Sequence, residues 1–174
     1  MKAVSVFDKS VAGAITRLPE SSAPFMNRLS LIGEPLVVLT VGAAGFVSAS
    51  ARGKSEERTA FILGFVAFGI GIILKLLLRR RRPHGHVVRN FGINSYSFPS
   101  GHAFGSVIFY GLYAVIDTKY LSSPWDALFI ALVAILIFFI GVSRVYKGIH
   151  YPSDVIAGWL VGAISLALIN RLAF

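Results

Sequence analysis

Long apolar runs constrain this chain more than any other feature of its sequence. Residues 59–78 form twenty consecutive positions with a single charged side chain, Lys75. A helix of that length rises about 30 Å, which is the thickness of the hydrocarbon core of a bilayer. Similar runs recur at about 35–51, 100–116, 125–145 and 153–170. These runs predict an all-α, polytopic membrane bundle of five transmembrane helices rather than a soluble helical protein.

The composition agrees with a membrane protein and limits its partners. Hydrophobic residues make up 55% of the 174 positions and charged residues only 14%, well below the share typical of a soluble domain. The net charge of +9 suits anionic lipid headgroups or phosphorylated substrates. A nucleic-acid partner is not expected, because the basic residues lie beside the spans and form no basic-aromatic surface motif. The chain has no Cys, which excludes thiol nucleophiles, Cys metal ligands and disulfides.

The first eighteen residues predict an amphipathic helix ahead of the spans. Apolar residues recur at helical spacing up to Leu18, and Pro19 ends the pattern. We expect an interfacial helix on the bilayer surface, with a helix packed on the protein core as an equal alternative. No uninterrupted apolar segment follows Lys2, so a cleaved signal peptide is not expected. No linker or repeat divides residues 1–174, which predicts a single membrane-embedded domain.

Successive spans alternate in direction, and this sorts their connections onto two sides of the membrane. The N-terminus, residues 79–99 and residues 146–152 share one side. Residues 51–58, residues 117–124 and the C-terminus share the other. Three unusual polar motifs are therefore expected to meet on the first side.

The first motif, KLLLRRRRP, joins the second span to a block of arginines at residues 75–83. Lys75 and Arg82 are seven residues apart, about two helical turns, so both project from one face about 10 Å apart. A charge inside a span is costly and usually functional, which singles out Lys75. Arg79, Arg80 and Arg81 suit a juxtamembrane anchor to lipid headgroups.

The second motif, Pro99-Ser100-Gly101-His102, opens the third expected span. Pro99 favours an extended entry, Ser100 is a natural N-cap, and Gly101 lets an anion approach the backbone. The free N–H groups and the dipole of a helix N-terminus then form an anion site. A cap alone would explain Ser100 but not the Gly-His that follows, and His102 is placed for proton transfer.

The third motif is SRVYKGIHYPSD, residues 143–154. Arg144 ends the fourth span, and His150 precedes the fifth by a Tyr-Pro turn. Asp154 can accept a hydrogen bond from one ring nitrogen of His150, which fixes the tautomer and leaves the other nitrogen for nucleophilic attack. A lone His-Asp pair is more often structural, but the cations and the capped helix end on the same side favour chemistry.

Together the three motifs resemble the signature of the type-2 phosphatidic acid phosphatase superfamily: Lys-x6-Arg-Pro, Pro-Ser-Gly-His and Ser-Arg-x5-His-x3-Asp. All eleven fixed positions match, namely Lys75, Arg82, Pro83, Pro99, Ser100, Gly101, His102, Ser143, Arg144, His150 and Asp154. The motifs cover residues 75–154, and the pattern of spans covers nearly all the rest. Common members have six spans, whereas this chain shows five and an amphipathic N-terminal helix.

The resemblance implies a metal-independent lipid phosphatase with a phosphohistidine intermediate. In it His150 attacks phosphorus, Asp154 orients His150, and His102 protonates the leaving oxygen and then activates water. The phosphoryl oxygens would be bound by Lys75, Arg82, Ser100, the Gly101 backbone and Arg144. Cations and a helix N-terminus can supply the charge stabilisation that Mg²⁺ gives elsewhere. No cofactor is expected, and for His84 and His86 a loop is favoured over a two-His metal site.

A site at the membrane interface favours a substrate whose phosphate is attached to a lipid. The short chain and loops resemble bacterial members, and lipid A 1-phosphate is the favoured substrate. Undecaprenyl diphosphate and phosphatidylglycerophosphate phosphatases share the motifs and stay as alternatives, as does a lipid phosphotransferase. A lipid-binding relative without turnover is the non-enzymatic alternative, which the intact His102, His150 and Asp154 disfavour. Vanadate-dependent haloperoxidases share the phosphate-binding residues, but they are soluble.

Four arginines exceed what the signature requires: Arg79, Arg80, Arg81 and Arg89. They either anchor the protein to lipid headgroups or bind a second phosphate of a polyanionic headgroup. Arg79 lies one turn from Lys75 and is the favoured candidate for a second phosphate.

The charge pattern and the family resemblance make opposite predictions about the side of the membrane on which the three motifs lie. Twelve Lys and Arg residues lie on the motif side and five on the other, which by the positive-inside rule places the motifs in the cytoplasm. Several of these charges are needed for chemistry, and bacterial relatives face outward. We therefore expect a multi-pass protein of the cell inner (plasma) membrane with an extracytoplasmic site.

Overall fold

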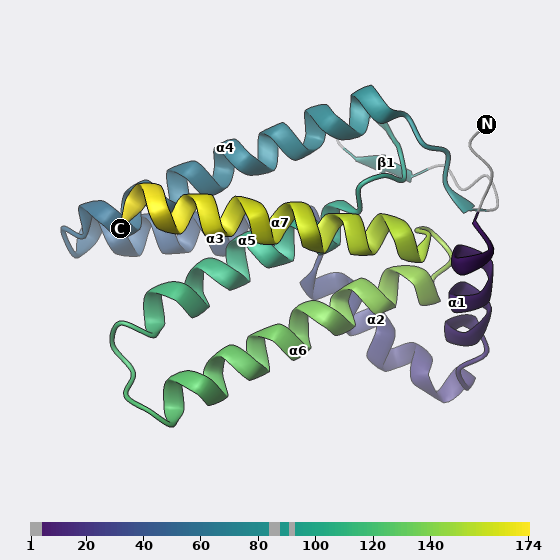
Figure 1. Cartoon of the computed structure of the whole chain (residues 1–174), viewed down its shortest axis with the longest axis horizontal. Coiled ribbons are helices and arrows are strands. Elements are labelled where there is room, and N and C mark those ends of the chain that lie inside the picture. Colours follow the sequence, from purple (N-terminus) through teal and green to yellow (C-terminus); the bar gives the residue numbers. More distant parts are fainter. Residues whose placement is uncertain (1–4, 84–87, 91–92) are drawn as a thin grey trace.

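The computed structural model describes residues 5–83, 88–90 and 93–174 as a bundle of long helices with a short helix across one end. In Figure 1 the helices α3 to α7 run along the length of the molecule, and α1 crosses the end opposite the C-terminus. The elements are α1 (Val6–Thr16), η1 (Glu20–Ser22), α2 (Ala23–Ile32), α3 (Pro35–Ala51), α4 (Ser55–Leu78), β1 (Val88–Asn90), β2 (Ile93–Ser95), α5 (Gly101–Asp117), α6 (Trp125–Tyr146) and α7 (Pro152–Ala173).

The helix α5 lies at the centre of the bundle. Twelve of its 17 residues are buried, and it contacts α3, α4, α6 and α7. Its side chains Phe104, Ile108 and Phe109 belong to the main apolar core. The buried residues of α6, in contrast, all lie between Ile140 and Val145, so its apolar N-terminal part faces outward. An outward apolar face suits lipid rather than water.

The membrane-spanning character of the chain is confirmed, whereas the number of five spans stays a prediction. The helices α4, α6 and α7 are each long and apolar enough to cross a bilayer. The segments Glu20–Ile32 and Pro35–Ala51 qualify together as one span bent by 48°. The helices α3 and α5 have 17 residues each, about 26 Å of rise, slightly less than the hydrocarbon core.

Three features of the fold differ from or add to the sequence expectation. The helix α2, with Pro24 in its first turn, was not predicted. The connection 79–99 contains a short antiparallel hairpin, in which Val88 pairs with Ser95, and two strands of three residues leave the predicted all-α class unchanged. The helix α1 packs on the core through Ala12 and Ile15, as in the alternative to a purely interfacial helix, while Val6 and Phe7 remain exposed. His84 and His86 lie outside the described residues.

Two glycines of α7 let it approach α5 closely. A Cβ at Gly158 would lie 2.8 Å from the backbone oxygen of Ser100 and 3.0 Å from the Ala103 Cβ. A Cβ at Gly162 would lie 2.7 Å from the Val107 Cβ. A small-xxx-small pair of this kind permits backbone contact between membrane helices. The contact fixes the N-terminus of α5 against α7, and these two helix starts carry the second and third motifs.

We predict that Gly158→Ala destabilises the protein and lowers its activity. The added methyl group meets the Ser100 carbonyl and must push α5 away from α7, which should cost about 1–3 kcal/mol. Gly69→Ala is the matched control, because a Cβ there meets nothing within 4 Å. Thermal unfolding and turnover in detergent measure both effects, and a Gly158→Ala protein as stable and active as Gly69→Ala would contradict the packing argument.

Candidate active site

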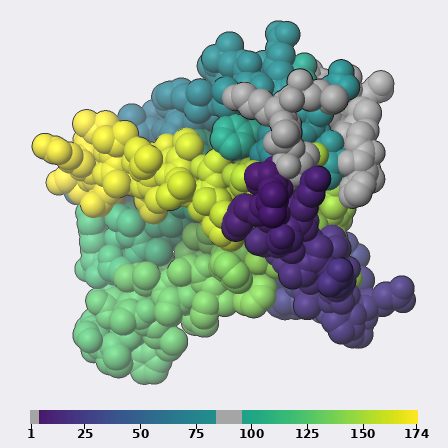
Figure 2. Space-filling model, turned by 45° about the vertical axis from the view of Figure 1, so that its right-hand side comes forward, coloured from purple at the N-terminus to yellow at the C-terminus, as the bar shows by residue number. Residues whose placement is uncertain are grey.

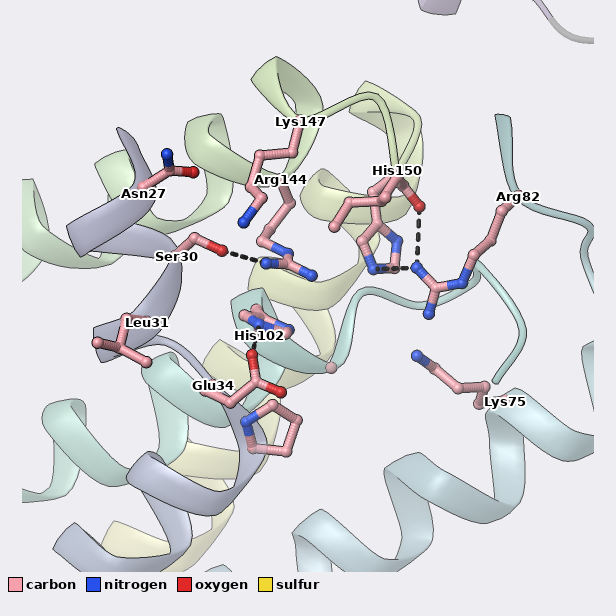
Figure 3. Close-up of a pocket in the computed structure, with 13 residues that line it drawn as sticks. Asn27, Ser30, Leu31, Glu34, Lys75, Arg82, His102, Arg144, Lys147 and His150 are labelled. Atoms are coloured by element: carbon pink, nitrogen blue, oxygen red, sulfur yellow. Dashed lines mark hydrogen bonds and ion pairs between the residues drawn. The ribbon is translucent and has the colours of Figure 1, made fainter. Parts of the chain in front are cut away.

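The three motifs meet at one end of the bundle and surround one pocket. The pocket has a volume of about 460 Å³. Figure 3 shows Lys75 from the end of α4, Arg82, His102 from the start of α5, Arg144 from α6 and His150 around it. The predicted convergence of the motifs on one side is therefore confirmed. The lining residues are Asn27, Ser30, Leu31, Glu34, Pro35, Lys75, Arg82, Gly101, His102, Arg144, Lys147, Ile149 and His150.

The tautomer of His150 follows from its neighbours. Its Nε2 lies 3.1 Å from Nη1 of Arg82, and Arg82 also donates to the Ile149 carbonyl at 2.9 Å. A guanidinium can only donate, so Nε2 accepts and the ring proton is on Nδ1. Nδ1 lies 3.6 Å from Oδ2 of Asp154. The lone pair of His150 thus faces the pocket, and its proton faces the carboxylate.

Burial keeps His150 uncharged. Desolvation lowers the pKa of His150 to about 3; Asp154 opposes this shift, and the cations Lys75 and Arg82 reinforce it. At neutral pH the ring is therefore a neutral imidazole. A neutral imidazole with its lone pair toward a pocket is chemically able to act as a nucleophile.

Asp154 is buried and held from several directions. Its side chain is 0% exposed. Its Oδ1 accepts a hydrogen bond from Arg80 at 2.6 Å, and its Oδ2 accepts from the Tyr151 N–H at 2.8 Å and from the Ser97 hydroxyl. The carboxylate therefore has a fixed direction relative to His150.

The cations and the start of α5 form a site suited to a phosphate. Arg144 is buried, donates to the Ser30 hydroxyl, and its Nε has no partner among the described residues. The Lys75 ammonium lies 3.7 Å from the place that a Gly101 Cβ would occupy. The first N–H groups of α5 precede the Phe104 N–H, which begins the helical hydrogen bonds. Lys75, Gly101 and Arg144 line the same pocket, an arrangement that is chemically suited to an anion.

Ser100 occupies the predicted N-cap position but does not cap with its side chain. Its backbone is extended, with φ −68° and ψ 116°, and its N–H donates to the Asp154 carbonyl. Its hydroxyl is buried and has no partner among the described residues. Ser100 does not appear in the lining of the pocket, so its predicted phosphate contact stays a prediction.

His102 has a partner that the motifs did not reveal. Its Nε2 lies 3.0 Å from a carboxylate oxygen of Glu34, one of the two residues between α2 and α3. The Glu34 side chain is 43% exposed and lines the pocket beside His102, as Figure 3 shows. A carboxylate at this distance orients the imidazole and balances a proton on it. The sequence indicates this partner only by an acidic residue directly before Pro35.

Three of the additional arginines, Arg79, Arg80 and Arg81, are not among the residues that line the pocket. Arg79, the C-cap of α4, is in the left-handed region at φ 48° and donates from Nε to the Leu76 carbonyl. Arg80 binds Asp154, and Arg81 is exposed. The side chain of Arg89 is outside the description. Their predicted contact with a headgroup remains a prediction. A cation that the motif analysis did not select, Lys147, lines the pocket instead.

The burial of His150 predicts a specific loss of stability in acid. Below its unfolded pKa of about 6.5 the unfolded chain binds a proton on this ring, whereas the folded ring stays neutral down to about pH 3. Unfolding is therefore favoured as the pH falls, by about 2 kcal/mol between pH 7 and pH 5 for this one residue. His150→Asn should lose less stability over that interval. Thermal unfolding in detergent at both pH values tests this, and equal losses in the two proteins would refute it.

Comparison with known proteins agrees with the geometry. The chain is 34% identical over 109 residues to an undecaprenyl-diphosphatase of Sulfolobus acidocaldarius, covering 60% of this chain and 49% of the relative. It is 30% identical over 165 residues to a lipid A 1-phosphatase of Rhizobium johnstonii, covering 86% of this chain and 64% of the relative. The chain thus spans about half to two thirds of the length of these curated relatives.

The fold is also that of a solved protein. The crystal structure of Aquifex aeolicus LpxE matches with a TM-score of 0.73 over 98% of both chains, at 18% sequence identity. The family model of the PAP2 superfamily matches residues 58–174, which contain all three motifs. The chain belongs to the PAP2 superfamily.

Proposed function

We propose that this protein is a membrane phosphatase that removes phosphate from a lipid phosphate or diphosphate through a phosphohistidine on His150. One observation carries the proposal. His150 is neutral, with its proton on Nδ1 toward Asp154 and the lone pair of Nε2 toward a pocket lined by cations. A buried imidazole with a carboxylate behind it and arginines in front matches the needs of nucleophilic phosphoryl transfer.

The first step transfers the phosphoryl group to the protein. A phosphate oxygen takes over the Arg82 N–H that now binds Nε2, which frees the lone pair. Nε2 forms the bond to phosphorus while the bond from phosphorus to the lipid oxygen breaks. His102 gives its proton to that leaving oxygen. The ring of His150 gains positive charge, and the Asp154 carboxylate, 3.6 Å from Nδ1, balances that charge.

The second step returns the enzyme to its starting state. A water molecule attacks phosphorus and gives its proton to His102, and the N–P bond breaks to release inorganic phosphate. Lys75, Arg82, Arg144 and the α5 N-terminus stabilise the charge on the phosphoryl oxygens in both steps. Glu34 holds the His102 ring in place while its proton leaves and returns.

We infer a lipid A 1-phosphate as the favoured substrate, with undecaprenyl diphosphate as the second candidate. Relatives are named for each of these activities, and residues from the end of α4 and the start of α5 line the pocket, where a headgroup would be. Asn27 and Lys147 extend the lining beyond the three motif cations, which suits a polar headgroup larger than one phosphate. Phosphatidylglycerophosphate and a phosphotransferase reaction remain the alternatives that a substrate panel separates.

The proposed mechanism needs no metal. The described residues contain no cluster of three or more His, Asp or Glu side chains suited to a metal ion. Cations of the chain itself supply the charge stabilisation in both steps. Activity that disappears in excess EDTA and returns with Mg²⁺ would point to a different mechanism.

We predict that His150→Ala abolishes phosphate release while the protein stays folded in detergent. The assay measures inorganic phosphate from lipid A, undecaprenyl diphosphate, phosphatidylglycerophosphate and phosphatidic acid, each with excess EDTA present. Quenching the reaction of a radiolabelled substrate should trap an adduct that is labile in acid and stable in base, on wild type only. His84→Ala, a histidine outside the three motifs, is the control. A folded His150→Ala protein with wild-type rates would end the proposal.

We infer that the active-site end faces outward from the inner (plasma) membrane. The twelve Lys and Arg residues on that side argue against this by the positive-inside rule. Lys75, Arg82 and Arg144 line the pocket, however, and Arg80 binds two carboxylates. These four charges have a use at the site and carry less weight as topology signals.

Cysteines introduced one at a time can test on which side of the membrane the active site lies, because the chain has no cysteine of its own. Ser95→Cys is in the hairpin at the active-site end, and Ser55→Cys begins α4 at the opposite end. A membrane-impermeant maleimide should label Ser95→Cys in intact cells and Ser55→Cys only after the membrane is opened. The reverse pattern would place the active site in the cytoplasm.

A further inference from the structure

A second buried carboxylate lies behind the active site, on the N-terminal helix. Asp8 of α1 is 1% exposed. It accepts hydrogen bonds from the Ser153 N–H at 2.9 Å, the Ser153 hydroxyl at 2.8 Å and Nη2 of Arg80 at 2.9 Å. Burial alone would raise the pKa of the Asp8 carboxyl, but the bonds from Ser153 and Arg80 outweigh burial and lower that pKa. A charge this buried is stable only where it is paired and hydrogen-bonded, as Asp8 is.

Arg80 connects Asp8 to the proposed orienting carboxylate. Its Nη1 donates to Oδ1 of Asp154 at 2.6 Å and to the Ser153 hydroxyl at 2.8 Å, while its Nη2 binds Asp8. The guanidinium lies 4.4 Å from the centre of the Tyr151 ring, a cation–π contact. The Arg80 carbonyl accepts from the Ser97 N–H, and the Ser97 hydroxyl donates to Asp154. A planar guanidinium can hold two carboxylates at a fixed angle, which a Lys cannot do.

Neither Asp8 nor Arg80 lines the pocket, so neither is placed to touch a substrate. Of the three proposed catalytic residues, Arg80 contacts Asp154, whose Oδ2 lies 3.6 Å from Nδ1 of His150. A small rotation of the Asp154 side chain would lengthen that distance further. Arg80 binds the opposite oxygen, Oδ1, and thus opposes such a rotation.

The charges of the group also suit the reaction. Asp8, Arg80 and Asp154 together carry one negative charge, while His150 is neutral at rest. Formation of a phosphohistidine makes the ring cationic, and the net negative group then balances it. Without Asp8 the group is neutral and balances the cation less well.

We propose that Asp8, Arg80 and Ser153 form a bridge that positions Asp154 against His150, so that the N-terminal helix α1 is a part of the catalytic site. This Asp8–Arg80 bridge rests on the proposed phosphatase function, and its members are positioning residues. Figure 2 shows α1 on the outside of the molecule. The side chain of Asp8 is nevertheless buried. In this proposal α1 has a role in positioning Asp154 that the amphipathic pattern of residues 1–18 does not indicate.

The test compares Asp8→Asn, Arg80→Gln and Ser153→Ala with wild type. Loss of a residue that orients a catalytic carboxylate should lower kcat about tenfold or more for Asp8→Asn and Arg80→Gln, with KM nearly unchanged. The double variant Asp8→Asn/Arg80→Gln should have the same kcat as Arg80→Gln alone, because Asp8 acts on Asp154 through Arg80. Glu20→Gln and Arg17→Gln are the matched controls, since both side chains are exposed next to α1, and they should keep kcat.

A second measurement does not depend on turnover. Vanadate, a stand-in for the phosphorane, should raise the unfolding temperature of wild type and controls and raise it less in the three variants. If Asp8→Asn does not fold, Ser153→Ala decides, since it removes only the hydroxyl that joins Asp8 to Arg80. Folded Asp8→Asn or Ser153→Ala with wild-type kcat and vanadate response would overturn the bridge. A wild type that releases no phosphate but responds to vanadate through Asp8 would overturn the function and keep the bridge.

Discussion

The active-site end of this molecule is organised around one buried carboxylate, Asp154. A carboxylate with no exposed surface is stable only if its oxygens are fully hydrogen-bonded and its charge is balanced. Arg80, Ser97 and the Tyr151 N–H meet this requirement at the side chain, and its carbonyl accepts from the Ser100 N–H. These partners come from the segment after α4, the segment before α5 and the start of α7. One residue of the third motif therefore contacts residues from the first and second motifs as well.

The packing of the bundle makes that arrangement possible. The Ser100 carbonyl lies so near α7 that position 158 has room for a glycine alone. The same close approach brings the α5 N-terminus, with His102, beside the α7 N-terminus that Asp154 belongs to. Along the rest of α5, aromatic residues fill the space to α4, with Phe68 and Phe104 stacked at 6.2 Å between ring centres. A rigid central helix is what a precisely positioned site requires.

The sequence predicted the elements that depend on local pattern. Apolar runs gave the positions of the long helices, and the alternation of spans brought Lys75, His102 and His150 to one end. It could not predict contacts between residues distant in the chain. Glu34 and His102 are 68 positions apart and Asp8 and Ser153 are 145 apart, with no spacing rule to connect them. Arg80 illustrates the limit, because four consecutive arginines suggest a headgroup anchor and only tertiary structure shows that one of them binds two carboxylates.

The distribution of charge explains why the two halves of the site have opposite character. Behind His150, two buried carboxylates share one arginine, which leaves a net negative region. In front of it, Lys75, Arg82, Arg144 and Lys147 line the pocket, with Glu34 as the carboxylate among the described lining residues. Cations this close repel one another and are poorly solvated, so a dianionic phosphate relieves both penalties when it binds. His150 stands at the boundary between the two regions. Transfer of a phosphoryl group to its ring therefore places the new positive charge toward the negative region and leaves the phosphoryl oxygens among the cations.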